Sequence, residues 1–146
     1  MFRIASLALT LVGGTISIAY ATDDVITTRQ KLMAANGAAT GAAAGMAKEE
    51  IAFNPVIAKA ALQSWSAVSF AFGDYFPEGS DTGDTRASPK IWEDAAGWSA
   101  ALEKFRADAE AAIAADPKDL DSFKTAMSLV TANCQSCHET FRLERK

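Results

Sequence analysis

The spacing of apolar residues near the C-terminus limits the fold more than any other feature of this 146-residue chain. Over residues 120–141 these residues recur at alternating intervals of three and four, which places them on one face of an α-helix. The series is Leu120, Phe123, Met127, Val130, Cys134, Cys137 and Phe141. Both cysteines belong to it, so we expect them on the buried side of that helix. Such a regular apolar face favours a bundle in which helices pack along their length.

Three further segments have helical periodicity, and nothing after residue 21 alternates convincingly with period two. The dipeptides Asn54-Pro55 and Ser88-Pro89 each read as a cap followed by proline at the first helical position. Pro77 closes the second helix, and Asp116-Pro117 ends the third helix and begins the last. The four expected helices are residues 23–48, 55–76, 89–116 and 117 to the end of the apolar series.

One long connection, PEGSDTGDTRAS at residues 77–88, is rich in turn formers, and the other connections are short. Short connections make consecutive helices antiparallel neighbours. The sequence therefore predicts an all-α fold, an antiparallel four-helix bundle whose facing helices are available to build a cofactor site in the interior.

The first 21 residues have the pattern of a secretory signal peptide, with basic Arg3, an apolar run and Ala19-Tyr20-Ala21 at the end. The apolar run is short and interrupted at residues 13–15, so we expect no stable membrane anchor. Removing the signal leaves residues 22–146 as one domain with a net charge of about −5, against −4 for the full chain. That acidity argues against nucleic acid as a partner.

The only histidine of the chain follows its two cysteines in the motif Cys134-Gln135-Ser136-Cys137-His138. This spacing lets two thiols reach one edge of a haem while the adjacent imidazole turns towards the iron. The alternatives fit less well. A redox-active Cys-x-x-Cys is expected beside a βαβ pattern, a structural zinc needs four ligands, and a plain disulfide leaves His138 without a role. The motif predicts one covalently attached haem c.

A secreted helical chain with this motif in its last helix resembles the class II c-type cytochromes, which include the high-spin cytochromes c' and their low-spin relatives. The resemblance covers essentially all of residues 22–146, through DVITTRQKLM (24–33), SPKIW (88–92) and CQSCHETFR (134–142). Only the last segment is specific by itself. The resemblance implies a periplasmic four-helix-bundle cytochrome with its haem near the C-terminus of the last helix.

The sixth position on the iron is open to methionine, because no second histidine is present. Met127 precedes His138 on the same helix by about three turns, on the proximal side, and reads as core. Met33 and Met46 share the first helix but lie roughly 140° apart around its axis and about 20 Å apart along it, so only one can face the haem.

Met33 is favoured because it opens a stripe of glycines, Gly37, Gly41 and Gly45. Glycine inside a helix costs about 1 kcal/mol relative to alanine, so the stripe suggests close approach of a macrocycle, a neighbouring helix or a second subunit. The resemblance indicates the same position, because family members place a bulky apolar residue or methionine four residues after an arginine-like position, here Arg29. Met33 as a core filler, or as a shield over an open iron, remains an alternative.

Two arginines are candidate partners of the haem propionates. Arg29 lies one turn before Met33, and Arg142 lies four residues after His138 on what we expect to be the same helix. For both, a role as a solvated surface side chain is an alternative. The aromatic residues at helical spacing are expected mainly in the core, with one or two lining the haem: Trp65, Phe72, Trp92 and Trp98.

These features predict an electron carrier and no enzyme, with a low-spin haem held by His138 and Met33 and with redox proteins as transient partners. The alternative is a five-coordinate protein of the cytochrome c' type that binds nitric oxide or carbon monoxide, with Met33 as a lid and no distal hydrogen-bond donor. Peroxidase-like chemistry needs a distal acid or base, and no histidine remains for it. A homodimer through the first helix is a further expectation, from family analogy and the glycine stripe.

Overall fold

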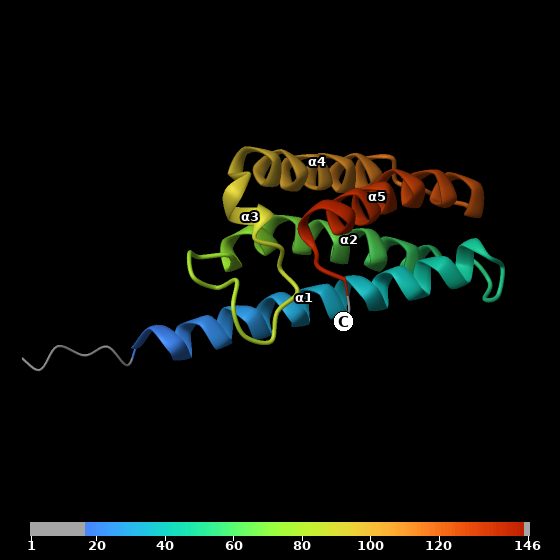
Figure 1. Cartoon of the computed structure of the whole chain (residues 1–146). Helices are drawn as coiled ribbons and strands as arrows, with labels where there is room; N and C mark the ends of the chain where they lie inside the picture. The colour runs from blue at the N-terminus through green and yellow to red at the C-terminus, as the bar shows by residue number, and fades with distance from the viewer. Residues whose placement is uncertain (1–16, 145–146) are drawn as a thin grey trace, which may run out of the picture.

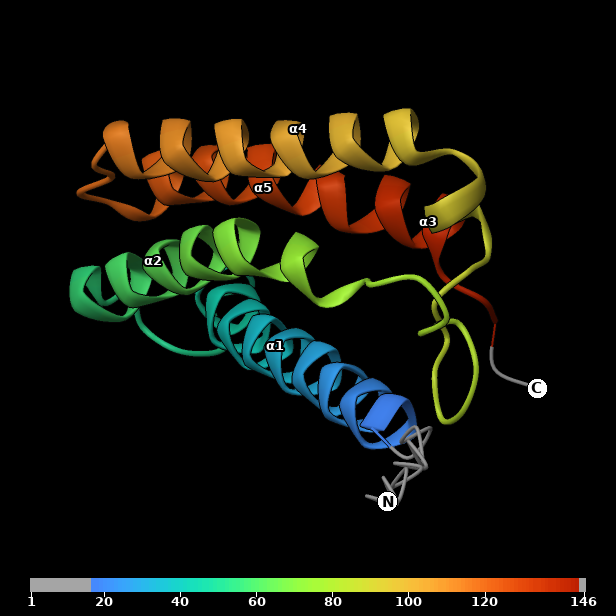
Figure 2. The same cartoon turned by 90° about the vertical axis from the view of Figure 1, so that its left-hand side faces the viewer.

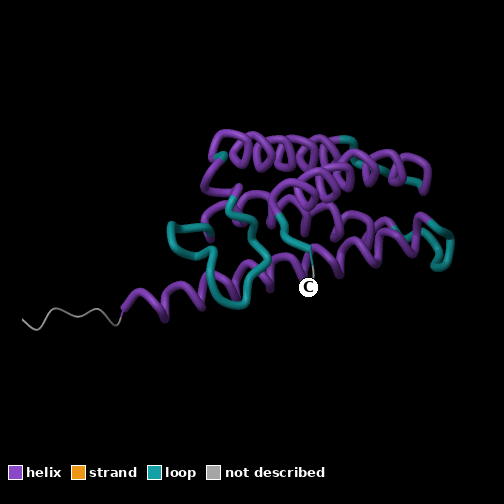
Figure 3. Tube along the Cα trace, in the orientation of Figure 1, coloured by secondary structure: helices purple, strands orange, loops and turns teal. Residues whose placement is uncertain are grey.

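The computed structural model describes residues 17–144, and its regular elements within that range are helices joined by loops, with one isolated bridge between Ala87 and Arg142 (Figures 1 and 3). None of the described helices is long and apolar enough to cross a membrane. Most of the predicted signal peptide lies outside the described residues. The elements are α1 (Ser17–Ala47), α2 (Pro55–Ala71), the 3-10 helix η1 (Phe72–Tyr75), α3 (Lys90–Glu93), α4 (Ala95–Ala114) and α5 (Leu120–Phe141).

The four long helices form the predicted bundle, with consecutive helices antiparallel (Figure 2). The pair α1 and α2 lies against the pair α4 and α5. The connection at 77–88 passes over the N-terminal half of α1, where Gln30 donates a hydrogen bond to the Asp84 carbonyl at 2.7 Å (Figure 1). This loop therefore covers the end of the bundle at which α5 finishes.

Helix starts follow the side-chain caps, and two predicted boundaries were wrong. Asn54 caps α2 as expected, since its side chain accepts hydrogen bonds from two backbone amides of the first turn. α5 begins at Leu120 rather than 117, because Asp119 and Ser122 form a reciprocal capping box. α1 begins at Ser17, earlier than the predicted Asp23, and the predicted cleavage site after Ala21 remains a prediction.

The predicted third helix is not continuous, which corrects the expectation of one helix over 89–116. The chain leaves the helical conformation at Asp94 (φ −121°, ψ 63°), where α3 ends and α4 begins. The Asp94 carboxylate accepts a hydrogen bond from the Gly97 amide at 2.9 Å and so caps α4. α3 is held separately, because Trp92 Nε1 donates to the carbonyls of Phe76 and Pro77, which follow η1.

The apolar core is divided into two clusters along the bundle. The first cluster lies at the end where α5 begins, around Met46, Trp65 and Phe123. The second lies where α5 finishes and consists of Ile91, Trp98 and Phe141 with Phe72, Phe76, Ala87, Trp92, Ala101, Leu102 and Cys137 packed against them. Its rings meet mostly edge to face, with the Trp98 and Phe141 centroids 5.2 Å apart. All four aromatic residues predicted in the core belong to one cluster or the other.

Candidate functional site

The predicted haem motif lies in the last two turns of α5, on the side that faces the bundle. Cys134 and Cys137 are free thiols, and both are half-buried, as is His138. Burial raises the pKa of the Cys134 thiol. Burial raises the pKa of the Cys137 thiol, and the neighbouring Cys134 raises it further. The positive charge of Arg142 lowers this pKa but does not reverse the shift. The two sulfurs are therefore presented as neutral thiols at one edge of the interior.

His138 is the second component of the motif. Burial lowers its pKa, and the positive charges of Arg142 and Arg86 lower it further. A lowered pKa favours the neutral imidazole, which is the form that binds iron. Its surroundings therefore suit the predicted role of a metal ligand.

On α5 the motif begins just after the last residue of the first cluster, Val130, and its Cys137 packs against the second cluster. Met46 of α1 and Phe123 of α5 share the first cluster, and the two helices run antiparallel (Figure 2). Met33 comes thirteen residues before Met46 on α1, and residue 136 comes thirteen residues after Phe123 on α5. Met33 is therefore level with Cys137 and His138, and it belongs to neither cluster.

The methionines separate clearly by position. Met46 is fully buried in the first cluster, and its Sδ accepts a hydrogen bond from the Asn54 amide at 3.4 Å. Met127 packs against the same cluster from α5. Met33 is half-buried on the face of α1 that also holds Arg29. Met46 and Met127 thus pack in or against the first cluster, while Met33 belongs to neither cluster and is level with the motif by the residue count given above.

Arg29 is buried rather than solvated, with 5% of its surface exposed. Its guanidinium donates to the Ser80 hydroxyl at 3.2 Å and to the Ser80 carbonyl at 2.7 Å, and it lies 4.6 Å from the centre of the Phe76 ring. Burial lowers the pKa of its guanidinium. Arg29 therefore attaches the 77–88 loop to α1, in addition to the propionate contact predicted for it.

Arg142 is exposed and lies just beyond α5 rather than on its helical face, which corrects the expected geometry. Its backbone is extended (φ −124°, ψ 132°) and forms the bridge with Ala87. Next to it, the Leu143 amide donates to the Arg86 carbonyl at 2.8 Å, and the Ser88 amide donates to the Phe141 carbonyl at 3.0 Å. This pairing places two guanidinium groups near His138, one of which no sequence pattern indicated.

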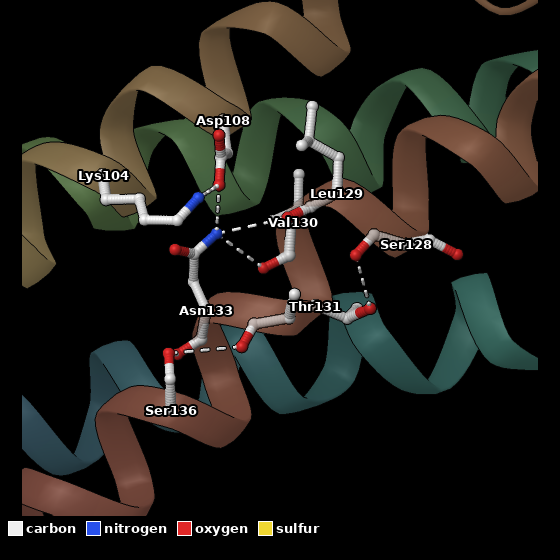
Figure 4. Close-up of polar contacts among 9 residues, drawn as sticks. Lys104, Asp108, Ser128, Leu129, Val130, Thr131, Asn133 and Ser136 are labelled. Carbon is white, nitrogen blue, oxygen red and sulfur yellow. Dashed lines mark hydrogen bonds and ion pairs between the residues drawn. The ribbon is translucent and has the colours of Figure 1, made fainter.

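A polar cluster fixes α5 to α4 immediately before the motif (Figure 4). Asn133 is buried, and its amide donates to Asp108 Oδ2 at 2.7 Å and to two carbonyls of its own helix. Lys104 pairs with the same carboxylate at 2.5 Å, and the Asp108 side chain is 15% exposed. We call these three residues the α4–α5 clamp. Periodicity searches for apolar residues overlook it, because its members are polar.

The glycine stripe faces open space over most of its length. An added Cβ at Gly37 or Gly41 would meet nothing within 4 Å, whereas one at Gly45 would meet the Ile51 side chain at 3.4 Å. Among the described residues, no neighbouring helix comes close to Gly37 or Gly41. The stripe therefore does not serve close packing within this chain at those two positions.

The donor set fits a haem better than a bare ion. No group of three or more His, Cys, Asp or Glu side chains is gathered in the described part of the chain. The motif offers two thiols on one edge and a single imidazole, and the core is interrupted between its two clusters. Thioether attachment uses both thiols, and the porphyrin itself supplies four nitrogen ligands to the iron.

The bundle with this motif in its last helix defines the class II c-type cytochromes. A family described as "Cytochrome C'" matches residues 24–142, and the chain belongs to that family. Proteins of this family are a known example of the up-down-up-down four-helix bundle. Cytochrome c-556 of Agrobacterium fabrum is 38% identical over 117 residues, 80% of each chain. Cytochrome c' of Rhodopseudomonas palustris is 38% identical over 144 residues, covering 98% of this chain and 97% of the relative.

A solved cytochrome c' from Rhodopseudomonas palustris has the same fold, with a TM-score of 0.79 and 37% identity over 84% of this chain and 98% of that one. The recognition of the family and the four-helix bundle are thereby confirmed. Membership in the cytochrome c'/c-556 family implies haem c as the cofactor and the monohaem electron-carrier type, and no enzymatic family is indicated.

Proposed function

We propose that this protein is an electron carrier with one haem c, attached through the sulfurs of Cys134 and Cys137. His138 and Met33 are its two axial ligands. The haem supplies the one-electron couple. The protein supplies the attachment, the ligands and a largely apolar surrounding, which are the means by which a cytochrome sets its potential.

The observation that carries the Met33 assignment is the placement of the described methionines. Met46 and Met127 are packed in or against the first cluster, and a count of residues along α1 and α5 favours Met33 as the described methionine nearest the level of His138. Methionine and histidine together keep the iron six-coordinate and low-spin in both oxidation states. The iron geometry then changes little on electron transfer, as a carrier requires.

The second candidate is a five-coordinate protein that binds nitric oxide or carbon monoxide. It is supported by the resemblance to cytochromes c' along nearly the whole chain. In this case Met33 is a lid over the iron and not a ligand. The two candidates share the haem, its attachment and His138, so they differ only at the sixth position.

Optical spectra of the ferric and ferrous protein, with and without carbon monoxide, distinguish the candidates. We expect low-spin bands in both states and little response to carbon monoxide. Met33→Ala should then produce a high-spin haem that binds carbon monoxide and stays covalently attached. Met46→Ala is the matched control on the same helix, and it should lower stability without changing the spin state. High-spin bands in the unsubstituted protein, or an unchanged spectrum in Met33→Ala, would overturn the ligand assignment.

The proposal extends to location and partners. The signal-peptide pattern of residues 1–21 supports export to the periplasm, with mature residues 22–146 acting there and meeting redox proteins through brief contacts. The open face at Gly37 and Gly41 supports a homodimer through α1. A solved cytochrome c' with 25% identity and a TM-score of 0.77 is described as having an unusual ligand-controlled dimer dissociation, which supports a dimer in this fold.

A further inference from the structure

Asn36 has a buried amide oxygen with no hydrogen-bond partner among the described residues. The residue is 9% exposed. Buried polar groups in folded proteins are nearly always paired, and each exception requires an explanation. The unpaired oxygen therefore indicates a polar partner that the described residues do not supply.

The position of Asn36 indicates where that partner lies. Asn36 comes one turn after Met33 on the buried face of α1, and the next turn leads to Thr40, which donates to the Asn36 carbonyl at 2.8 Å. Thr40 in turn accepts a hydrogen bond from Trp65 Nε1 at 3.2 Å, at the edge of the first cluster. By the register that places Met33 level with residue 136, Asn36 is level with Asn133 and one residue short of Cys134. Asn36 is thus buried on α1 at the level where the motif begins on α5, and a haem bound to His138 would have α1 on its opposite side.

We propose that Asn36 is the hydrogen-bonding residue of the distal haem face, and that it stabilises small polar ligands bound at the sixth position. This deepens the proposed function: it rests on the haem being held at Cys134, Cys137 and His138, and it does not depend on whether Met33 is a ligand. It also changes the expectation from the sequence, which placed no donor on that face.

The chemistry follows from the side-chain amide. Its oxygen and NH2 group have nearly the same shape, so a half-turn about the last side-chain bond presents either an acceptor or a donor at one position. The terminal atom of bound cyanide or dioxygen carries negative charge and accepts such a hydrogen bond, whereas bound carbon monoxide is a much poorer acceptor. Asn36 therefore favours polar ligands over carbon monoxide.

The test measures cyanide binding to the ferric protein and carbon monoxide binding to the ferrous protein. Both are measured in a Met33→Ala background, where the sixth position is open whether or not Met33 occupies it in the native protein. We expect Asn36→Leu to weaken cyanide binding about tenfold, the loss of one hydrogen bond, and to leave carbon monoxide binding within about twofold. Gln63→Leu makes the same change from amide to aliphatic side chain at an exposed position of α2, and it should alter neither affinity.

Equal changes in the two affinities, or no change in either, would overturn the role of Asn36. If Asn36→Leu does not fold with haem attached, Asn36→Ala decides the question by the same ratio, because it removes the amide without adding bulk. Should the unsubstituted protein prove five-coordinate, the same titrations are made without Met33→Ala. In that case Met33 is not a ligand, and the cyanide and carbon monoxide titrations still decide the role of Asn36.

Discussion

At the residue scale, Arg29 has two separable roles, one visible in the polypeptide and one expected towards the haem. Its two terminal nitrogens both donate to Ser80, and its cation lies over the Phe76 ring. Ser80 is fully buried, and its hydroxyl donates to the Pro77 carbonyl at 2.7 Å. The loop at 77–88 is thus folded around the Arg29 guanidinium. Arg29 is therefore a buried structural residue and not a solvated surface side chain.

Arg29→Ala should therefore destabilise the protein by about 2–3 kcal/mol, through the loss of charged hydrogen bonds to a buried partner. Loop 77–88 should also become more open to proteolysis. Denaturant unfolding and limited digestion measure the two effects. Arg29→Lys is the matched variant, since it keeps the charge without the forked geometry and should recover only part of the stability. Unchanged stability together with an intact loop would show that the Ser80 contact contributes nothing.

The residue scale also shows the limit of spacing arguments. The spacing of Cys134, Cys137 and His138 was enough to predict haem, because the chemistry of attachment is local in sequence. The haem-side roles of Met33 and Arg29 remain predictions. Asn36 gave no signal in the sequence, because one asparagine in an alanine-rich helix has no pattern, and its unpaired oxygen exists only once the helices are packed.

At the element scale, apolar periodicity predicted where the helices lie but not where each one begins and ends. The break in the predicted third helix shows why. Ile91 and Trp98 both belong to the second cluster, so the apolar series continues across the break at Asp94. The break follows from local polar chemistry that the series ignores. The Asp94 carboxylate folds back onto the Gly97 amide, and a Cβ at Gly97 would collide with it. Similar caps set the start of α5, whereas Asn54 before a proline was recognisable in the sequence.

The α4–α5 clamp should make the stability of the protein depend on pH. Burial raises the pKa of Asp108, but the hydrogen bond from Asn133 and the pairing with Lys104 outweigh it and lower the pKa below 3.8. A carboxyl whose pKa is depressed on folding stabilises the fold above its unfolded pKa, and this stabilisation is lost as the pH falls through the folded value. Asp108→Ala should therefore cost about 1–3 kcal/mol at pH 7. The difference from the unsubstituted protein should close as the pH falls through values below 3.8.

Denaturant unfolding at neutral and acid pH measures this difference. Glu110→Ala is the matched control, because it removes an exposed carboxylate from the same helix and should show little effect at either pH. A penalty for Asp108→Ala that stays constant with pH would mean that its cause is packing rather than charge. Reduction potentials of the same variants test whether the clamp also positions the haem-bearing turns.

At the scale of the whole molecule, the fold class was predictable because a bundle needs only helices of the right period and connections of the right length. The division of the core was not. The first cluster joins all four long helices at one end of the bundle, and the second gathers aromatic rings under the loop and the end of α5. Two separate clusters look the same in sequence as one continuous core, because the apolar series on α5 runs through both.

This division predicts how the molecule responds when the haem cannot be attached. Replacing Cys134 and Cys137 by serine should abolish covalent haem, and the proposed haem would then no longer join the two clusters. Unfolding should then lose its cooperativity, and far-UV helicity should fall. Hydrogen exchange should be fast in the Met33 turn of α1 and in the end of α5, yet still slow around Trp65 and Phe123 in the first cluster. Ser136→Ala, on the exposed side of the same turn, is the control that keeps both thiols. A double variant with native helicity and a single sharp transition would mean that the two clusters meet without the cofactor, and that haem is not part of the core.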